Sequence, residues 1–446
     1  MKALERRLSG RREASLEELE EVQSELATLS LRELTSLLGR TSASRGAKIL
    51  RLLPPERSAA LFDALTAAHQ ADLIRALGDD KVVNYFGAIG AEDRVALLDH
   101  LPVEIAERLV RQLDEDDQRV TSVVLGYRKG TVGRRMSPKV PNVTPEMTVR
   151  EVVGLLHDHV DELETIYTIP VVDADRSVCG VLRLRSLFRA ADDDRVAEMM
   201  EDASVFHAGD DLEDSARWLL SSGRLAVPVV DDDNRLIGIF TYDEAHDVAE
   251  GANSEDSARM GASEALRTPY LSTPVLRLVR SRIVWLLVLA LSAILTVQVL
   301  DIFQATLEQV VVLSLFIPLL TGTGGNTGNQ AATTVTRALA LNDVSKSDIL
   351  SVLWRELRVG MLLGAVLGSL GFLLATAFFG LGIGTVIGAT LLIICTISAT
   401  VGGMMPIIAK AVGADPAVFS NPFISTFCDA TGLVVYFLIA KSVLGI

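Results

Sequence analysis

The chain contains 446 residues, 49% of them hydrophobic, and carries a formal net charge of −15 at pH 7. Residues 283–446 hold only 6 of the 42 Lys and Arg and 7 of the 57 Asp and Glu, so residues 1–282 hold 36 and 50. An acidic region therefore precedes an apolar region that is long enough for several membrane spans. We expect the apolar region to have membrane lipid as a partner. The acidic balance argues against nucleic acid as a partner, because phosphate binding requires basic patches; it suits divalent cations, which carboxylates favour.

The cysteine pattern and the motif content narrow the class of protein. Cys179, Cys395 and Cys428 are isolated, with no CxxC pattern, which indicates a reducing compartment for the acidic region. The first 39 residues lack an apolar h-region, so we expect no cleaved signal peptide and an acidic region that stays on the side of synthesis. The chain has no catalytic triad, Walker motif or aspartyl-phosphate signature, and we expect neither an enzyme nor a pump.

Residues 1–130 are predicted to form a helical, superhelical N-terminal domain. Apolar residues recur with helical spacing in segments such as 16–38 and 59–77. A Leu-Pro-x-Glu sequence at 53–56 recurs at 101–104, and proline followed by glutamate is typical of a helix start. Repeated helix pairs of this kind predict a small superhelical array. The acidic run at 114–117 is interpreted as a solvated helix junction rather than a metal site.

Residues 131–195 and 196–250 are predicted to form two copies of one domain. Residues 169–173 (IPVVD) match 227–231 (VPVVD) at an offset of 58, and a second strand containing Gly180 or Gly238 follows each. A helical stretch, 149–157 or 212–220, lies upstream of each of the two matched sequences. This order resembles a tandem pair of cystathionine-β-synthase (CBS) regulatory domains. The resemblance implies a small-ligand sensor, commonly for an adenine nucleotide such as ATP, with Thr241 and Asp243 as nucleotide contacts.

Carboxylates are concentrated around the connecting segment, residues 251–280, and just before it. Asp243, Asp247 and Glu250 follow helical i, i+4 and i+7 spacing, so they share one face. A solvated linker helix and a ligand-responsive connector both account for this pattern. The candidate metal-binding carboxylates here are Asp243, Glu244, Asp247, Glu250, Glu255 and Asp256.

Residues 281–446 are predicted to form a transmembrane domain of five helices. The apolar spans are 283–303, 310–335, 359–379, 383–409 and 417–440. Basic residues precede the first span and lie between spans two and three and between four and five, whereas the first-to-second connection holds Asp301 and Glu308 and no base. The positive-inside rule therefore places the N-terminus in the cytoplasm and the C-terminus outside.

The second span contains the sequence PLLTGTGGNTGNQ at 318–330. Pro318 and four glycines are expected to loosen or break the helix, so that freed carbonyls and polar side chains line water. The candidate pore-lining residues are Gly325, Asn326, Gly328, Asn329 and Gln330. By contrast, the Gly360, Gly364 and Gly368 series in span three is interpreted as small-residue helix packing.

The fifth span carries one charged residue, Asp429, in its middle. Asn421, Ser425 and Asp429 lie at i, i+4 and i+8, so a helix places them on one face. A carboxylate at membrane depth costs a few kcal/mol or more and normally faces water or a partner. We interpret the three residues as one wall of a cation path; the alternative is that Asp429 only hydrogen-bonds a neighbouring helix.

This combination of domains and motifs resembles the MgtE-type magnesium channel family over nearly the whole chain. The motifs are residues 316–330 in span two and Asn421 to Gly432 in span five. The resemblance implies a homodimer in the bacterial inner membrane, with a two-fold pore lined by the second and fifth helices of both subunits. Each subunit would contribute its Asp429 as the carboxylate that selects the ion, and Asn421 and Ser425 would lie along the path. Two carboxylates plus carbonyls can hold hydrated Mg²⁺ through its water.

The resemblance also implies feedback, in which cytosolic Mg²⁺ bridges the soluble domains and the connecting ("plug") helix and closes the pore. Glu244, Asp247, Glu255 and Asp256 occupy matching acidic positions. Ala252 stands where an acid is expected, and residues 128–130 (RKG) replace an acidic run, so we expect less sensitive gating. Two rivals stay open: transport of another divalent ion such as Mn²⁺ or Co²⁺, and a membrane-anchored nucleotide sensor with a structural span bundle.

Overall fold

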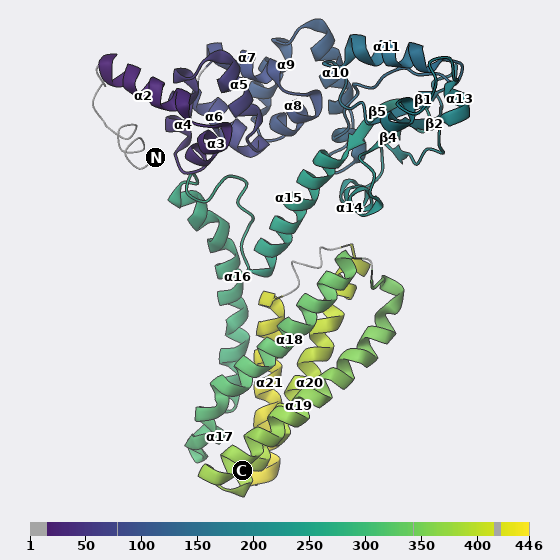
Figure 1. The fold of residues 1–446 in the computed structure, drawn as a ribbon. Helices are drawn as coiled ribbons and strands as arrows, with labels where there is room; N and C mark the ends of the chain where they lie inside the picture. Colours follow the sequence, from purple (N-terminus) through teal and green to yellow (C-terminus); the bar gives the residue numbers. More distant parts are fainter. Residues whose placement is uncertain (1–15, 78, 342, 414–420, 446) are drawn as a thin grey trace. The chain divides into compact units, whose positions relative to one another are not determined.

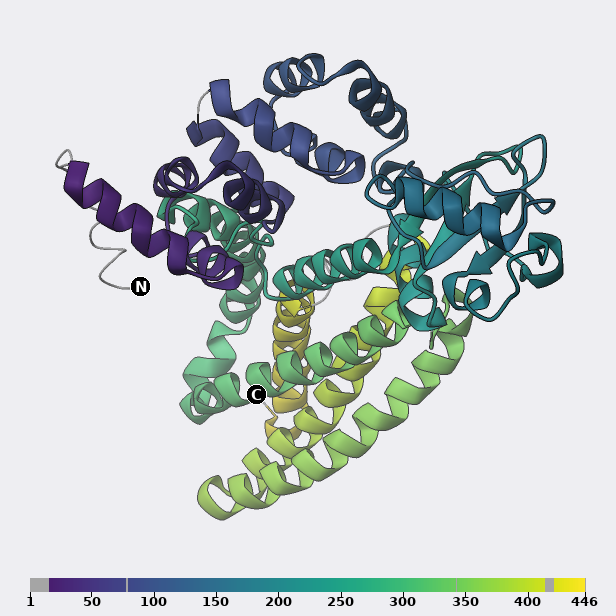
Figure 2. The same cartoon turned by 45° about the horizontal axis from the view of Figure 1, so that its top comes forward.

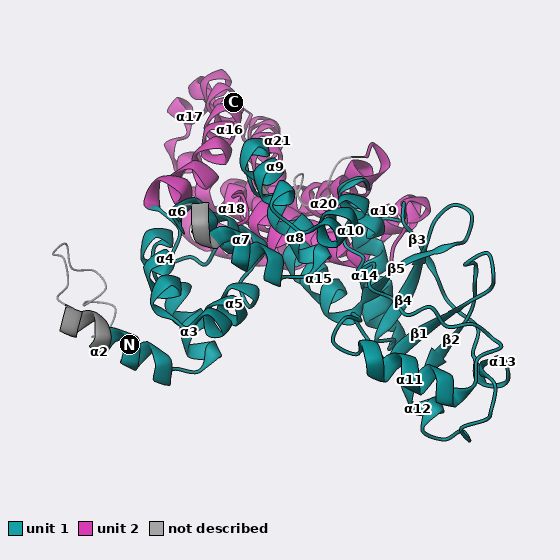
Figure 3. Ribbon diagram, turned by 90° about the horizontal axis from the view of Figure 1, so that it is seen from above, with its two compact units in different colours: residues 1–253, 266–274 teal, residues 254–265, 275–446 magenta. Residues whose placement is uncertain are grey.

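The computed structural model describes residues 16–77, 79–341, 343–413 and 421–445. It divides into two compact units, coloured in Figure 3: residues 1–253 with 266–274, and residues 254–265 with 275–446. The first unit holds the helical domain and the two repeats, and the second holds the apolar helices. Each unit is described in turn.

The N-terminal domain consists of short helices joined by tight turns (Figures 1 and 2). Their apolar faces meet in one core, in which Leu26, Leu34, Phe62 and Phe86 are fully buried. The prediction of an all-helical domain is confirmed. The helices are α2 (Leu16–Thr28), α3 (Leu31–Leu38), α4 (Ala43–Leu52), α5 (Pro55–Asp63), α6 (Ala67–Leu77), α7 (Asp79–Ala88), α8 (Ala91–Leu98), α9 (Val103–Arg111) and α10 (Glu115–Leu125).

The two long helical segments predicted here are each divided into two helices. In 16–38 the break lies at Ser30, whose Oγ accepts from the Glu33 backbone N–H while the Glu33 carboxylate accepts from the Ser30 backbone N–H at 2.8 Å. This capping box starts a new helix, although the apolar spacing continues through it. The segment 59–77 is interrupted between α5 and α6. The predicted helix starts are confirmed, since Pro54 and Pro102 are the N-caps of α5 and α9.

The two repeats fold as the sequence predicts. In the first, β1 (Thr168–Val172) pairs antiparallel with β2 (Val178–Arg183). In the second, β4 (Ala226–Val230) pairs antiparallel with β5 (Leu236–Thr241) and parallel with β3 (Phe206–His207). The accompanying helices are η1 (Val132–Arg134), α11 (Val149–His159), α12 (Leu184–Leu187), α13 (Val196–Met199) and α14 (Leu212–Ser222).

The Asp-rich turns explain why the repeat is so regular. Asp173 Oδ1 accepts from the backbone N–H groups of Asp175 at 3.0 Å and Ser177 at 2.8 Å. Asp231 Oδ1 accepts from Asp233 and Arg235 at the same two distances. A short side-chain acceptor at this place closes the turn and fixes the hairpin register.

The connecting region differs from the expected boundaries. Helix α15 (Tyr242–Met260) begins before residue 251, and the first apolar helix begins at Val275. Residues 266–274 belong to the first unit. There the hydroxyls of Thr268 and Thr273 lie 2.9 Å apart, and a Cβ added at Gly39 would lie 3.5 Å from Pro269 Cβ.

The apolar unit is a bundle of long helices, in which α18, α20 and α21 pack together (Figure 1). Among the described residues, four helices are long and apolar enough to cross a membrane: α16, α19, α20 and α21. Helix α18 is 24 residues long but polar in its middle, and it packs against α20 and α21. The elements are α16 (Val275–Ile302), α17 (Gln304–Gln309), η2 (Val311–Phe316), α18 (Ile317–Ala340), η3 (Lys346–Asp348), α19 (Ile349–Phe379), α20 (Leu381–Ala411) and α21 (Asn421–Leu444).

The predicted second span, 310–335, is loosened only at its start, where Val311–Phe316 form the 3-10 helix η2. The glycines do not break it, because α18 runs without interruption from Ile317 to Ala340. Pro318 lies in its first turn, where the missing N–H would have no helical partner in any case. The glycines instead allow close approach of neighbouring helices. A Cβ added at Gly402 of α20 would lie 2.2 Å from the Gly328 carbonyl oxygen of α18.

The packing interpretation of the glycine series in α19 is confirmed. Cβ atoms added at Gly360, Gly364 and Gly368 would lie 2.8, 2.6 and 2.6 Å from backbone carbonyl oxygens of α20. These distances are too short for any side chain, so the α19 and α20 backbones touch along three turns.

Candidate functional site

The polar faces predicted on α18 and α21 meet in the structure. A Cβ built on Gly325 would lie 3.7 Å from Ser425 Oγ and 3.8 Å from Asp429 Oδ1. One turn further along α18, Asn329 Nδ2 donates to Ser425 Oγ at 3.0 Å. Gly325 and Asn329 of α18 are four residues apart, and so are Ser425 and Asp429 of α21, so each pair lies on one face of its helix. Because the later residue of α18 contacts the earlier residue of α21, the two helices run antiparallel along this contact.

Several oxygen atoms gather at this contact. The amide nitrogen of Asn329 donates a hydrogen bond to Ser425. The buried Oδ1 of Asn329 has no hydrogen-bond partner among the described residues. Asp429 adds a half-buried carboxylate directly opposite Gly325. Carboxylate, amide and hydroxyl oxygens are the ligand types that suit hard divalent cations, either directly or through water.

The other predicted residues of α18 divide between two faces. Gly328 is buried against Ile424 of α21 and the backbone of α20, so it serves helix packing. Asn326 and Gln330 are exposed on the surface of the bundle. Polar amides on a membrane helix have to face protein or water rather than lipid.

The structure describes α21 from Asn421 onward, which places Asn421, Ser425 and Asp429 on the same face of one helix. The side chain of Asn421 lies outside the part of the chain that is described.

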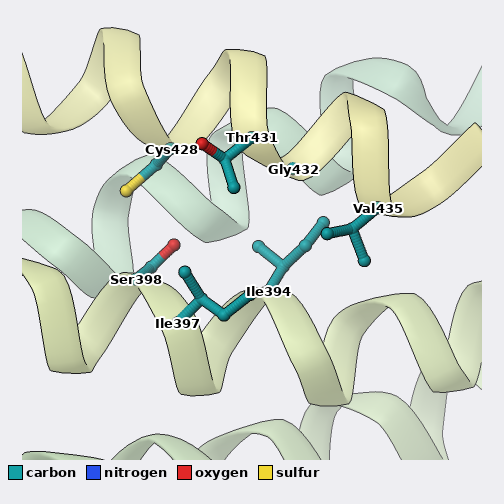
Figure 4. Close-up of a pocket in the computed structure, with 7 residues that line it drawn as sticks. All are labelled: Ile394, Ile397, Ser398, Cys428, Thr431, Gly432 and Val435. Carbon is teal, nitrogen blue, oxygen red and sulfur yellow. The ribbon is translucent and has the colours of Figure 1, made fainter.

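A pocket lies beside this contact, between α20 and α21 (Figure 4). Cys428 and Ser398 approach it from facing helices. It is lined by Ile394, Ile397, Ser398, Cys428, Thr431, Gly432 and Val435. The lining is mostly apolar and includes none of the predicted ion-path residues, so we assign the pocket to helix packing.

A second group of candidate residues lies in the first unit, where carboxylates from three segments come together. Glu92 and Asp93 of α8 lie near Glu244 and Asp247 of α15. Glu164, from the loop before β1, lies close to Glu92 and Asp93. We call these five residues the interdomain carboxylate cluster.

Burial strongly perturbs this cluster. It raises the pKa of Glu244 to about 8, that of Glu92 to about 7 and that of Asp93 to about 6, and the neighbouring carboxylates add to each rise. Arg135 lowers the pKa of Glu244 and Asp93 in part, because its Nε forms an ion pair with the Glu244 carboxylate. The Oε2 atom of Glu92 is buried without a hydrogen-bond partner in the described chain.

The predicted regulatory residues are therefore placed in different environments. The Glu244 side chain is 11% exposed and paired, whereas Asp243, Asp247 and Glu250 are exposed on the same helix. Glu255 pairs with Arg259, and it falls in the second unit together with Asp256. In the described part of the chain, no three His, Cys, Asp or Glu side chains converge closely enough to hold a metal ion.

The sequence reasoning missed Glu92, Asp93 and Glu164. Glu92 and Asp93 occupy the first turn of α8, where acidic residues are common because they suit the helix dipole. No local signal distinguishes them from ordinary helix-start carboxylates. For the predicted nucleotide contacts, Thr241 ends β5 with a buried side chain and Asp243 is exposed two residues later.

Comparison with protein families covers most of the chain. Residues 317–439 match the MgtE divalent cation transporter model, and residues 29–130 match the MgtE intracellular N domain. Residues 131–193 and 196–248 match the CBS domain.

Two curated relatives agree with these matches. The chain is 34% identical over 403 residues to the magnesium transporter MgtE of Thermus thermophilus, covering 89% of each chain. It is 32% identical over 320 residues to that of Enterococcus faecalis, covering 71% of this chain and 70% of the relative. A solved cytosolic domain of the Mg²⁺ channel MgtE in complex with ATP is 28% identical, with a TM-score of 0.48, over 51% of this chain and 93% of that one.

Proposed function

Because this chain belongs to the MgtE family of magnesium transporters, we propose that it is an Mg²⁺-selective channel that imports magnesium across the bacterial cytoplasmic membrane. The observation that carries the proposal is the contact of α18 with α21, where Gly325 and Asn329 face Ser425 and Asp429. In an apolar bundle, a carboxylate set among amide and hydroxyl oxygens suits the passage of a hydrated divalent cation.

In this proposal two copies of the chain form the pore around a two-fold axis. Asp429 is contributed by both subunits and attracts the ion, while Asn421 and Ser425 lie along the path. The exposed amides of Asn326 and Gln330 support a second copy or water on that face of α18, because lipid cannot satisfy them. Mg²⁺ loses its water reluctantly, so the carboxylates hold it through its hydration shell.

The proposed orientation places the N-terminus in the cytoplasm and the C-terminus outside. Arg337, Lys346, Arg355 and Arg358 lie between or at the ends of α18 and α19, which supports a cytoplasmic connection there.

The channel closes, in this proposal, when cytosolic Mg²⁺ binds acidic residues of the soluble region and α15. The carboxylates assigned to this role are Asp243, Glu244, Asp247, Glu250, Glu255 and Asp256. Oxygen-rich acidic groups suit Mg²⁺, and binding relieves the repulsion between them. With Ala252 in place of an acid and a basic sequence at 128–129, the closing should need more Mg²⁺.

The matched CBS pair supports a nucleotide site as a further part of the proposal, with Thr241 and Asp243 as contacts. Titration of the purified protein with ATP would test this site. We expect the wild type to bind ATP and the Asp243→Ala variant to bind it more weakly. If the variant binds ATP as tightly as the wild type, Asp243 is not part of the site.

The decisive experiment is Mg²⁺ uptake into liposomes by the purified full-length protein. We expect Asp429→Ala to abolish uptake and the matched control Asp301→Ala, an exposed carboxylate at the end of α16, to retain it. Dimerisation and folding are checked for each variant by size-exclusion chromatography. Competition by Mn²⁺ and Co²⁺ then separates a magnesium channel from a pathway for another divalent ion.

Equal uptake by the wild type and Asp429→Ala would mean that this carboxylate only joins helices, and the pore assignment would be rejected. If the wild type shows no uptake even with Mg²⁺ removed from the cytosolic side, the transport proposal fails and the nucleotide-sensor reading replaces it.

A further inference from the structure

Helix α19 carries two arginines and a tryptophan near its start, on the side that does not pack against the bundle. Trp354, Arg355 and Arg358 are all exposed, and the Trp354 side chain is 60% exposed. On a helix these three positions fall within about 100° of one another, so they share one face. Leu362, one turn further along, is 70% exposed on the same face. We call these four residues the outer face of α19.

The opposite face of α19 packs against α20. A Cβ added at Gly360 would lie 2.8 Å from the Cys395 carbonyl oxygen, and one added at Gly403 of α20 would lie 2.6 Å from Glu356 Cγ. Glu356, the acid next to these arginines in the sequence, is therefore turned toward α20 and away from the outer face. Among the described residues, Arg358 contacts the carbonyl oxygen and the ring of Trp354, and no acid forms an ion pair with it.

The length of α19 places this face at the membrane surface. The helix ends at Phe379, and Gly380 follows. Because a hydrocarbon core of about 30 Å takes about 20 helical residues, the part of α19 within the hydrocarbon begins near residue 360. Arg358 then lies at the level of the lipid headgroups, with Leu362 in the hydrocarbon below it. A guanidinium in hydrocarbon is unfavourable, so that of Arg358 has to reach headgroup phosphates or water.

The guanidinium of Arg358 is held toward the headgroup side. Its Nε donates to the Trp354 carbonyl oxygen at 3.3 Å, and its Cζ lies 5.8 Å from the centre of the Trp354 ring. Both contacts are with the preceding turn of the helix, which lies further from the hydrocarbon. They leave the Nη groups for a ligand, and a guanidinium fork fits a phosphate better than a single ammonium does. A tryptophan ring also prefers the headgroup level.

We propose that the outer face of α19 binds the headgroup of an anionic phospholipid, with Arg355 and Arg358 on the phosphate and Trp354 and Leu362 against the glycerol and the acyl chains. Charge decides the class of lipid. A zwitterionic lipid brings its own ammonium group, which the two arginines repel, whereas a phosphatidylglycerol headgroup brings only a negative charge. Only the choice of the cytoplasmic leaflet rests on the proposed function, because it follows from the proposed orientation.

Quenching of Trp354 fluorescence by brominated lipid tests the proposal. The full-length protein carries Trp218→Phe and Trp285→Phe, so that Trp354 is the one tryptophan that remains of three. It is reconstituted in EDTA into phosphatidylcholine vesicles that contain a small fraction of brominated phosphatidylglycerol or of brominated phosphatidylcholine. The ratio of the two quenching efficiencies gives the preference for anionic lipid beside Trp354. One arginine near an anionic headgroup changes binding by about fivefold, so we expect the parent to favour phosphatidylglycerol by at least that factor.

Four variants show which charges carry the preference. Arg358→Gln should lower it by about fivefold, and the variant that also carries Arg355→Gln should have none left. Arg358→Lys keeps the charge without the fork and should fall between the parent and Arg358→Gln. Lys441→Gln is the matched control, because it removes a cation near the end of α21, against the Phe303 ring, and it should keep the preference of the parent. Size-exclusion chromatography before reconstitution checks the folding of each variant.

Equal quenching of the parent by both lipids would overturn the proposal, and the outer face would then contact lipid without a preference for negative charge. A preference that survives the loss of both arginines would also overturn it, since the anionic lipid would bind elsewhere near Trp354. Quenching by neither lipid would reject the lipid site as well, because a second copy of the chain would then cover the outer face. None of these readouts needs transport, so a failure of the proposed channel leaves the result on lipid intact.

Discussion

The addition of one methyl group at Gly402 of α20, in the Gly402→Ala variant, should push α18 and α20 apart. A Cβ added there would lie 2.2 Å from the carbonyl oxygen of Gly328 and 2.8 Å from its Cα and carbonyl carbon. All three atoms are backbone, so no side chain can rotate away. Because real Cβ contacts essentially never fall below 3.0 Å, the Gly402→Ala variant needs a relative shift of α18 and α20 of at least about 0.8 Å.

A shift of this size reaches the candidate ion path. Gly328 is followed by Asn329, whose amide donates to Ser425 at 3.0 Å. If α18 moves along this bond by about 0.8 Å, the distance becomes about 3.8 Å, which is outside hydrogen-bond range. Overpacking of this kind costs about 1–3 kcal/mol. We therefore expect a lower free energy of unfolding and reduced Mg²⁺ uptake together.

Unfolding of the purified protein by SDS in mixed micelles measures the first effect, and liposome uptake measures the second. Gly322→Ala is the matched control on α18, because a Cβ there meets no described atom within 4 Å. It should unfold at the same SDS fraction as the parent or slightly later. A Gly402→Ala variant as stable as the control would refute the close contact between α18 and α20.

Three further predictions concern other buried groups. Arg94→Ala should lower the free energy of unfolding of the helical domain by about 3 kcal/mol, because it leaves Asp117 and two backbone carbonyls unpaired; hydrogen exchange of the α8 and α10 amides measures this, and unchanged exchange would contradict it. Tyr436→Phe should cost about 1–2 kcal/mol in the SDS titration, since the buried Leu313 carbonyl loses the donor that lies 2.9 Å away. Burial lowers the pKa of His69 below its usual 6.5, so at this residue the unfolded chain binds more protons, and the contribution of His69 to stability is lost as pH falls through 6.5. The raised pKa values of Glu92 and Asp93 act in the opposite direction in the same pH range. The measurement is therefore the difference in thermal melting between the parent and His69→Gln from about pH 7.5 to about pH 5.5, and relative to the variant the parent should lose stability toward the acidic end.

The repeats were the most predictable part of the fold. Their hairpins are fixed by local chemistry, in which Asp173 and Asp231 close identical turns, so the sequence alone indicated strands, turns and pairing. Helix boundaries were harder to predict. The apolar spacing runs through Ser30, and only its pairing with Glu33 marks the break.

The error in α18 has a different origin. A proline in the interior of a helix breaks the helix, whereas a proline in the first turn stabilises the start of the helix. The effect of Pro318 therefore depends on where α18 starts. Its glycines could mean backbone freedom or close packing, and only the position of α20 decides between them. In the same way, Glu92 and Glu244 are about 150 residues apart in the sequence, and no local pattern indicates that they meet.

The polar middle of α18 also affects the order in which the bundle can be assembled during synthesis. A segment with this few apolar residues gains little from entering lipid by itself. The amide nitrogen of Asn329 and the close glycine contacts of α18 find their partners on α21 and α20, which the ribosome makes later. We therefore expect α18 to wait at the insertion machinery or the membrane surface until those two helices arrive. The last helix of the chain would then complete the insertion of the second span.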